Sequence, residues 1–513
     1  MTLLRSIATV GSMTMVSRVF GFVRDILIAA VLGAGSMADV FFVAFKIPNL
    51  FRRLFAEGAF NLAFVPIFAG ILEEKGEEAA RQFADQAMAV LLWALIVLVI
   101  VFELAMPWAL AVFAPGFLSD PEKFALAVEL TRITFPYIVF ISLVSLMAGV
   151  LNSLGKFAAA AATPILLNIC LIGAVLIFAP LAETPAHALA WGVFVAGIIQ
   201  LGWLMLHCRR VGFRPRLRRP AFSENVRLLV RRALPVALGA GIYQINLLID
   251  TIIASFLPAG SISYLFFADR VNQLPLGVVG VAVGTALLPL LSRHIRAGDA
   301  DGAGHNQNRA VEFSLLLTLP AACALFVIAE PLVRVLFARG AFGEAQAAAT
   351  AAALAVFALG LPAYVLVKAL APGFFARGDT ASPVKISVLA MVVNVGLSLI
   401  LMGPFLHVGI AMATAASSWL NAGLMAFVLH RRGHFRADTR LKSRLPRTLL
   451  ASVGMGLVLY LGAAWLAPWL AGAELERGLA LFALVAVGLV SFAVLAQVSG
   501  AARLGDIKSL RRP

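Results

Sequence analysis

Charged side chains interrupt the most apolar segments of this chain, beginning with two arginines and an aspartate in "SRVFGFVRD", residues 17–25. An ionised group in hydrocarbon is costly unless it faces water or a partner, so each such residue is a functional candidate. The first two apolar segments carry eight of them: Arg18, Arg24, Asp25, Asp39, Lys46, Arg52, Arg53 and Glu57. Later segments add Asp250, Asp269, Arg270 and Lys368.

The spacing of these charges predicts which face of each helix they occupy. Arg18 and Asp25 are seven residues apart, which places them on one helical face, whereas Arg24 points elsewhere. Gly21 lies between them and predicts a bend that turns both arginines toward one cavity. In the next segment a seven-residue spacing, extended by one turn, predicts a charged stripe of Asp39, Lys46, Arg53 and Glu57. Pro48 removes a backbone donor there and frees the carbonyl of Ala44.

A cationic cavity within a bilayer favours an anionic ligand. Planar guanidinium groups suit phosphate oxygens in bidentate geometry, so a phosphate or diphosphate headgroup is the best match, with carboxylates second. Two alternatives stay open. Arg24 with Asp25, and Asp269 with Arg270, could be ion pairs that pin helices together, although neighbours on a helix do not face each other and each would need a partner from elsewhere. Lys46, Arg53 and Glu57 could instead snorkel to the interface.

Other chemistry has weaker support in the sequence. Asp250, with Asn394 and Thr414 in later segments, could form a cation or proton site, and a hydrogen-bonded structural carboxylate fits equally well. The three cysteines form no metal or disulfide pattern and are interpreted as packing residues. Nucleotide-binding, zinc-protease and serine-hydrolase motifs are absent from the sequence, which favours a transporter over an enzyme and gives no cofactor. Six histidines at span ends or in loops show no ligand spacing: His207, His294, His305, His407, His430 and His434.

Composition sets the class of protein. Hydrophobic residues make up 61% of the chain and charged residues 13%, and long apolar runs recur throughout, which predicts an all-α integral membrane protein. About fourteen spans are expected, near 6–32, 37–71, 84–107, 124–151, 157–180, 186–207, 233–257, 261–292, 311–329, 347–375, 383–402, 406–429, 447–470 and 477–499. The first segment lacks a cleavage site and is expected to remain in the protein.

Basic residues in the loops predict the orientation. The loop between the sixth and seventh spans holds nine arginines, and the loop between the twelfth and thirteenth holds seven Lys or Arg. Such loops stay preferentially cytoplasmic, so both termini are expected in the cytoplasm. The net charge of +15 is accordingly explained by topology and anionic membrane lipids, and no nucleic-acid partner is expected.

An internal repeat divides the chain. An offset of 223–226 residues places "FFVAFKIPNL" (41–50) over "LFFADRVNQL" (265–274) and "AFVPIF" (63–68) over "ALLPLL" (286–291). Two six-helix lobes in a parallel pseudo-two-fold repeat around a central cavity are therefore predicted, over residues 1–220 and 221–440. Residues 441–513, with the last two spans and a cytoplasmic tail, lie outside the duplication and are expected to face lipid.

Three long stretches identify a family resemblance: "SMTMVSRVFGFVRDILIAAVLGAGSMADVFFVAFKIPNLFRRLFAEGAFNLAFVPIF", "YLFFADRVNQLPLGVVGVAVGTALLPLLS" and "VKALAPGFFARGDTASPVKI". They resemble the bacterial lipid II flippase family (MurJ, or MviN) of the multidrug/oligosaccharidyl-lipid/polysaccharide exporter superfamily. The resemblance covers essentially the whole chain. It implies alternating access in the bacterial inner membrane and transfer of lipid II, the undecaprenyl-diphosphate-linked peptidoglycan precursor, from the cytoplasmic to the periplasmic leaflet for cell wall biogenesis.

The resemblance also implies site residues. The family's cavity arginines fall on Arg18, Arg24, Arg52 and Arg270, and its acidic cavity positions on Asp25 and Asp39. Arg24, Arg52 and Arg270 are expected to contact the diphosphate, Arg18 and Asp25 to gate or orient, and Asp39 to meet the polar headgroup. Secondary cavity candidates are Ser17, Lys46, Asn49, Arg53, Glu57, Asp269 and Lys368.

The last two spans would form a groove for the lipid tail. A sodium site of relatives falls on Asp250, Asn394 and Thr414, but Ser398 stands where a second carboxylate is expected, which weakens the case for Na⁺ or H⁺ coupling there. Cell-wall synthesis proteins are further partners to consider. The alternatives are an exporter of another polyprenyl-diphosphate glycan or of amphipathic drugs, and a scaffold of the wall-synthesis machinery.

Overall fold

The computed structural model describes residues 3–53, 60–216 and 219–502. Contacts between Cα atoms divide the chain into two compact units, Met1–Ser263 and Tyr264–Pro513. We call them the N-unit and the C-unit and describe each by itself. The lobe boundaries at 220 and 440 expected from the repeat remain predictions.

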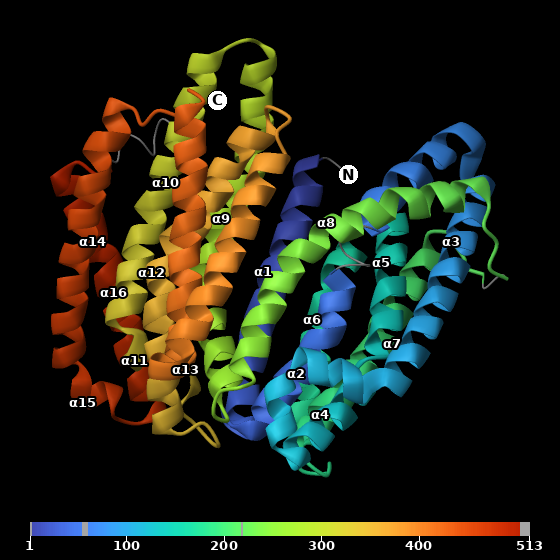
Figure 1. Ribbon diagram of the computed structural model, residues 1–513, viewed down its shortest axis with the longest axis horizontal. Helices are drawn as coiled ribbons and strands as arrows, with labels where there is room; N and C mark the ends of the chain where they lie inside the picture. The colour runs from blue at the N-terminus through green and yellow to red at the C-terminus, as the bar shows by residue number, and fades with distance from the viewer. Residues whose placement is uncertain (1–2, 54–59, 217–218, 503–513) are drawn as a thin grey trace. The chain divides into compact units, whose positions relative to one another are not determined.

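The N-unit is built from helices that pack along one another (Figure 1). Helix α1 contacts α6, α2 contacts α4, and α5 packs against both α3 and α7, while α8 contacts α3. The helices are α1 (Leu3–Leu32), α2 (Ser36–Phe51), α3 (Asn61–Phe113), α4 (Pro121–Thr134), α5 (Tyr137–Ser153), α6 (Phe157–Gly173), α7 (Pro185–Arg210) and α8 (Glu224–Ala254), with short η2 (Pro115–Ser119) and η3 (Ala174–Phe178).

The C-unit is also built from helices that pack along one another. Helix α12 packs between α10 and α13, and α14 contacts both α10 and α16 (Figure 1). The helices are α9 (Ser261–Arg296), whose first turn holds the division between the units, α10 (Ala300–Val327), α11 (Ala329–Phe337), α12 (Glu344–Phe375), α13 (Ala381–Arg431), α14 (Thr439–Trp465), α15 (Ala467–Leu470) and α16 (Glu474–Ser499).

Two long helical segments break where the sequence predicts a loop between spans. Gly76, with φ of 81°, interrupts α3 between the spans expected at 37–71 and 84–107. Leu406 interrupts α13 between the spans expected at 383–402 and 406–429, with φ of 51°. That left-handed conformation is unfavourable for a residue with a branched side chain, and Pro404 just before it prevents a regular helix from continuing. The span expected at 124–151 divides into α4 and α5 around Pro136.

The helical membrane class is confirmed. Nine helical segments in the described part of the chain are long and apolar enough to cross a bilayer. Large apolar side chains point outward from them, including Trp108 and Trp465, each 72% exposed, and Val498, 80% exposed. In water such a surface would aggregate, whereas hydrocarbon solvates it. The total of fourteen spans stays a prediction.

Candidate functional site

Arg24 and Asp25 form a buried ion pair on α1. The Nη2 atom of Arg24 lies 2.6 Å from Asp25 Oδ1 and its Nε atom lies 3.0 Å away, while Nη1 donates to Asn168 Oδ1 of α6 at 2.9 Å. Arg24 is 8% exposed and Asp25 3%. The ion pair that the sequence left open as an alternative is therefore present: the long arginine side chain folds back to its neighbour while keeping a partner on another helix.

Asn168 also fastens α6 to the backbone of α1. Its Nδ2 atom donates to the carbonyl of Ser17 at 2.9 Å. A Cβ atom at Gly21 would lie 3.4 Å from the same Nδ2 atom, so glycine leaves room for this close approach. The structure describes α1 as one helix from Leu3 to Leu32, so the helix does not end at Gly21, and the bend expected there stays a prediction. Arg18, one residue beyond Ser17, is exposed.

Asp39 is an internal anchor of the N-unit. Its Oδ1 atom accepts hydrogen bonds from the amide and hydroxyl of Ser263 at 2.9 and 2.7 Å, and Oδ2 accepts from the amide of Gly260 at 2.7 Å. Lys123 Nζ lies 3.4 Å from Oδ2. The carboxylate is 1% exposed, so its geometry differs from that expected of a headgroup contact.

The polar atoms of α2 that precede its last turn are bonded to other helices. Lys46 donates to the hydroxyl of Thr251 on α8. The Ala44 carbonyl, which Pro48 leaves without a helical donor, accepts from the buried hydroxyl of Thr134 on α4 at 2.8 Å. The freed carbonyl expected from the sequence is thus satisfied within the N-unit instead of lining a charged stripe.

The end of α2 is more accessible. Arg52 Nε donates to Asn49 Oδ1 at 3.1 Å, and Asn49 Nδ2 donates to the Phe45 carbonyl at 2.9 Å. Arg52 is half-buried and Arg53 is exposed. Glu57 lies outside the described residues.

Helix α9 carries the charged pair of the C-unit. Asp269 accepts a hydrogen bond from Gln273, one turn further along the same helix. The guanidinium carbon of Arg270 lies 4.7 Å from the centroid of the Phe266 ring, a cation–π contact also within α9. Both charged residues are half-buried, and Lys368 on α12 is exposed.

The candidate cation ligands lie on two parts of the chain. In the C-unit, the buried Asn394 accepts from the Ser417 hydroxyl at 3.4 Å, and the Thr414 hydroxyl donates to the Ile410 carbonyl. The hydroxyl of Ser398 is buried and has no hydrogen-bond partner among the described residues. Asp250 belongs to α8 of the N-unit and is half-buried. The coupling ion stays a prediction.

The last two long helices line an open apolar pocket of about 510 Å³. Val458 of α14 faces residues of α16 across it: Ala486, Val487, Val490, Ser491, Val494 and Leu495. Such a pocket offers no polar specificity and suits a hydrocarbon chain.

The charged residues fall into two groups, according to their partners and their exposure. Arg24, Asp25 and Asp39 hold helices together through buried, charge-assisted hydrogen bonds. Arg18 is exposed, and Arg52 and Arg270 are half-buried. The sequence classed all of them alike, because residue type and spacing show intramembrane charge but not its partners.

Comparisons with a family pattern and with individual relatives all give the same family. The sequence pattern of the family described as "Lipid II flippase MurJ" matches residues 28–480. A "Probable lipid II flippase MurJ" of Rhizobium meliloti (strain 1021) is 46% identical, over 100% of this chain and 97% of the relative. A "Lipid II flippase MurJ" of Burkholderia cenocepacia is 39% identical, over 85% of both chains.

Solved structures agree on the fold. One titled "Lipid II flippase MurJ, inward closed conformation" has a TM-score of 0.77 at 23% identity and covers 95% of this chain and 98% of its own. An inward-facing multidrug resistance MATE family transporter of the MOP superfamily has a TM-score of 0.67 at 14% identity, over 85% of this chain and 98% of its own. At these identities the structures support the architecture alone.

Proposed function

The chain belongs to the lipid II flippase MurJ family, and from that premise we propose that it moves lipid II from the cytoplasmic to the periplasmic leaflet of the bacterial inner membrane. The observation that carries this proposal is the 46% identity to a named relative over the full length of both chains. The protein is a multi-pass membrane transporter and its reaction makes or breaks no covalent bond. Both termini would lie in the cytoplasm, as the basic loops predict.

The accessible arginines would bind the diphosphate. Arg52 and Arg270 are half-buried and carry planar donors that match phosphate oxygens, and Arg18 is exposed on α1. Arg24 would reach the diphosphate only by exchanging Asp25 or Asn168, which suits a positioning role. Asp39 would keep the start of α2 fixed while the headgroup passes.

The lipid tail and the driving force complete the proposal. The apolar pocket of α14 and α16 would accept part of the polyprenyl chain, while the rest stays in the membrane. Asp250, Asn394 and Thr414 would contribute to Na⁺ or H⁺ coupling if transport uses a cation gradient. Interaction with cell-wall synthesis proteins would place the flippase near the enzymes that consume lipid II.

Reconstitution tests the function directly. Lipid II is placed in both leaflets of proteoliposomes, and an externally added hydrolase cleaves only the outer pool. With the wild-type protein we expect complete cleavage. Arg52→Ala and Arg270→Ala should leave the inner pool protected while the protein remains inserted, and Arg296→Ala, an exposed arginine of the same α9 helix, is the matched control.

Two results would contradict the proposal. An inner pool that stays protected with the wild-type protein would remove lipid II as the substrate. Normal transfer by both arginine variants would retain the flippase but remove Arg52 and Arg270 as headgroup ligands. Depletion in cells offers a second measure, since the precursor should then fail to reach the periplasmic face.

A further inference from the structure

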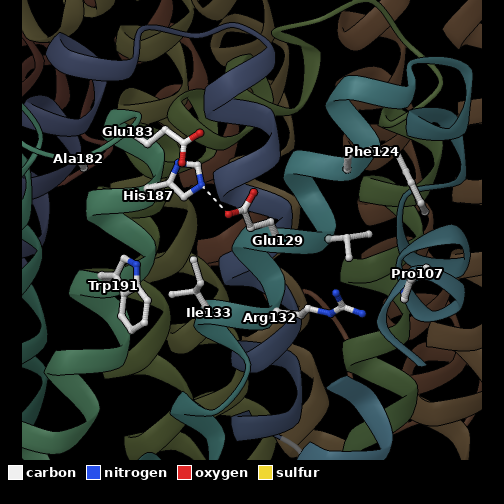
Figure 2. Close-up of a pocket in the computed structure, with 11 residues that line it drawn as sticks. Pro107, Phe124, Glu129, Arg132, Ile133, Ala182, Glu183, His187 and Trp191 are labelled. Carbon is white, nitrogen blue, oxygen red and sulfur yellow. Dashed lines mark ion pairs between the residues drawn. The ribbon is translucent and has the colours of Figure 1, made fainter. Parts of the chain in front are cut away.

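The N-unit holds a pocket of about 890 Å³ at the start of α7. Helices α3, α4 and α7 and the loop before α7 line it, with Pro107, Phe124, Ile133 and Trp191 forming apolar walls. Figure 2 shows the side chains of Glu183, His187 and Glu129 gathered at one end of this pocket. They come from the loop, α7 and α4 and lie in none of the charged positions assigned to transport.

These three side chains have the composition of a metal site. One ligand atom from each lies within 4.8 Å of the other two. His187 Nε2 lies 3.3 Å from Glu129 Oε1 (Figure 2). Imidazole nitrogen and carboxylate oxygen are ligands of Zn²⁺, and two carboxylates with one histidine leave a fourth position open.

The fold already orients the side chain of His187 for binding a metal ion. The residue is 6% exposed, and its Nε2 atom is buried without a hydrogen bond among the described residues. The other ring nitrogen, Nδ1, lies 2.8 Å from the hydroxyl of Thr184, the residue that caps α7. Histidines that bind metals usually have the second nitrogen held by such a partner, which fixes the direction of the first.

The distances also suit a metal ion. In a tetrahedral zinc site with bonds of about 2.0–2.1 Å, two ligand atoms lie about 3.3 Å apart. His187 Nε2 and Glu129 Oε1 already have that separation. Glu183 is exposed, so its side chain can rotate inward without loss of packing.

Charge around the cluster limits its affinity. Arg132 is one turn beyond Glu129 and lines the same pocket, where its guanidinium would oppose a cation. Its Nε atom is held by the Glu103 carbonyl at 3.3 Å. With two carboxylates and one arginine the immediate surroundings keep one negative charge, which favours a divalent cation over an anion.

We propose that Glu129, Glu183 and His187 bind a divalent transition-metal ion of the Zn²⁺ type at the end of α7 opposite its basic terminus. That basic terminus, with His207, Arg209 and Arg210, begins the arginine-rich loop. Under the orientation that the basic loops predict, the metal site is periplasmic. Its occupancy would tie the loop before α7 to α4.

Calorimetry on the full-length, chelator-treated protein in detergent tests the site with Zn²⁺ alone. The wild-type protein should bind one Zn²⁺ per chain at this site and melt at a higher temperature with the ion than without it. His187→Ala and Glu183→Gln should each weaken binding by at least about tenfold and abolish the thermal shift. Co²⁺ in place of Zn²⁺ should give visible absorption bands that the same variants lose.

Matched controls separate this site from surface binding. Glu122→Gln replaces another exposed carboxylate of α4, and His207→Ala replaces the histidine at the far end of α7; both should bind Zn²⁺ like the wild type. Unchanged affinity in Glu183→Gln and His187→Ala would overturn the proposal and leave a His187–Glu129 ion pair. Glu183→Gln alters an exposed side chain, so its result does not depend on core stability. The assay requires no lipid II, which separates its outcome from that of the flippase test.

Discussion

The repeat-related segments 41–50 of α2 and 265–274 of α9 hold their polar side chains in different ways. On α2, Lys46 bonds Thr251 of α8, and Asp39, just before the segment, bonds backbone at 260–263. On α9, Asp269 accepts from Gln273 and Arg270 covers Phe266, all within the same helix. The sequence aligns Lys46 with Arg270; the Lys46 hydrogen bond joins two helices, whereas the cation–π contact of Arg270 with Phe266 lies within α9.

This difference indicates a division of labour between the two copies. A bond across helices fixes their separation and would be disturbed if the side chain turned toward a ligand. A contact within one helix leaves the helix free to move and needs little change in packing when the side chain turns. The bonds of Asp39 and Lys46 to other segments therefore make the α2 copy an anchor before its last turn.

The largest expected effect comes from the anchor. Asp39→Ala leaves Lys123 and the donors of Gly260 and Ser263 without their buried acceptor, so we expect the free energy of unfolding to fall by about 3–5 kcal/mol. Thermal unfolding in detergent measures the change. Asp269→Ala on α9 is the matched control and should shift the melting temperature far less. Equal shifts in the two variants would show that the copies are not divided in this way.

A smaller effect is expected at the connection between α1 and α6. Asn168→Leu removes the acceptor of Arg24 and the donor to the Ser17 carbonyl, which should lower the free energy of unfolding by about 1–2 kcal/mol. Asn49→Leu is the control, because the Asn49 amide bonds a carbonyl of its own helix. Chemical denaturation of both variants gives the comparison. An Asn49 variant that loses as much as the Asn168 variant would remove the distinction between connections across helices and within one.

The sequence predicted the class of fold and several local features but not the partners of the charges. Apolar runs gave the helical membrane class, and the loops expected near 76 and 406 coincide with backbone breaks. The pairing of Arg24 with Asp25 could only be left open as an alternative, because helical periodicity describes Cβ directions, whereas a long side chain can fold back. Asn168 is 144 residues from Arg24, and no local pattern connects them.

Two further features depend on tertiary structure in the same way. Two of the four donors to Asp39 are backbone amides, which have no sequence signature. The Glu129–Glu183–His187 cluster joins three separate segments. Only the four-residue spacing from Glu183 to His187, across the start of α7, offered a local signal, and the histidines considered from the sequence did not include His187.

The smallest effect is expected at Asp379, whose carboxylate lies near water and is compared with the buried carboxylates. Asp379 precedes α13, outside the apolar part of the helix, and its carboxylate accepts from the Ser382 amide at 2.9 Å and from Arg432. Hydrogen bonds from Ser382 and then from Arg432 hold the pKa of Asp379 well below its ordinary value. The stability it contributes is therefore present above the unfolded pKa of about 3.9 and is lost as the pH falls from there through the lower folded pKa.

Asp379→Asn should lower the melting temperature by a small and equal amount at pH 7 and pH 5, because the wild-type carboxylate is ionised in both the folded and the unfolded chain at either pH. The difference between wild type and variant should narrow below about pH 4, where the unfolded chain takes up a proton that the folded chain does not. Thermal melts at pH 7, 5 and 3 measure this, with Glu122→Gln as an exposed carboxylate control. If the difference in melting temperature between wild type and variant widened toward pH 3, the Asp379 contacts would not favour the ionised form. The half-buried Asp379 could then no longer serve as a reference for the buried Asp39.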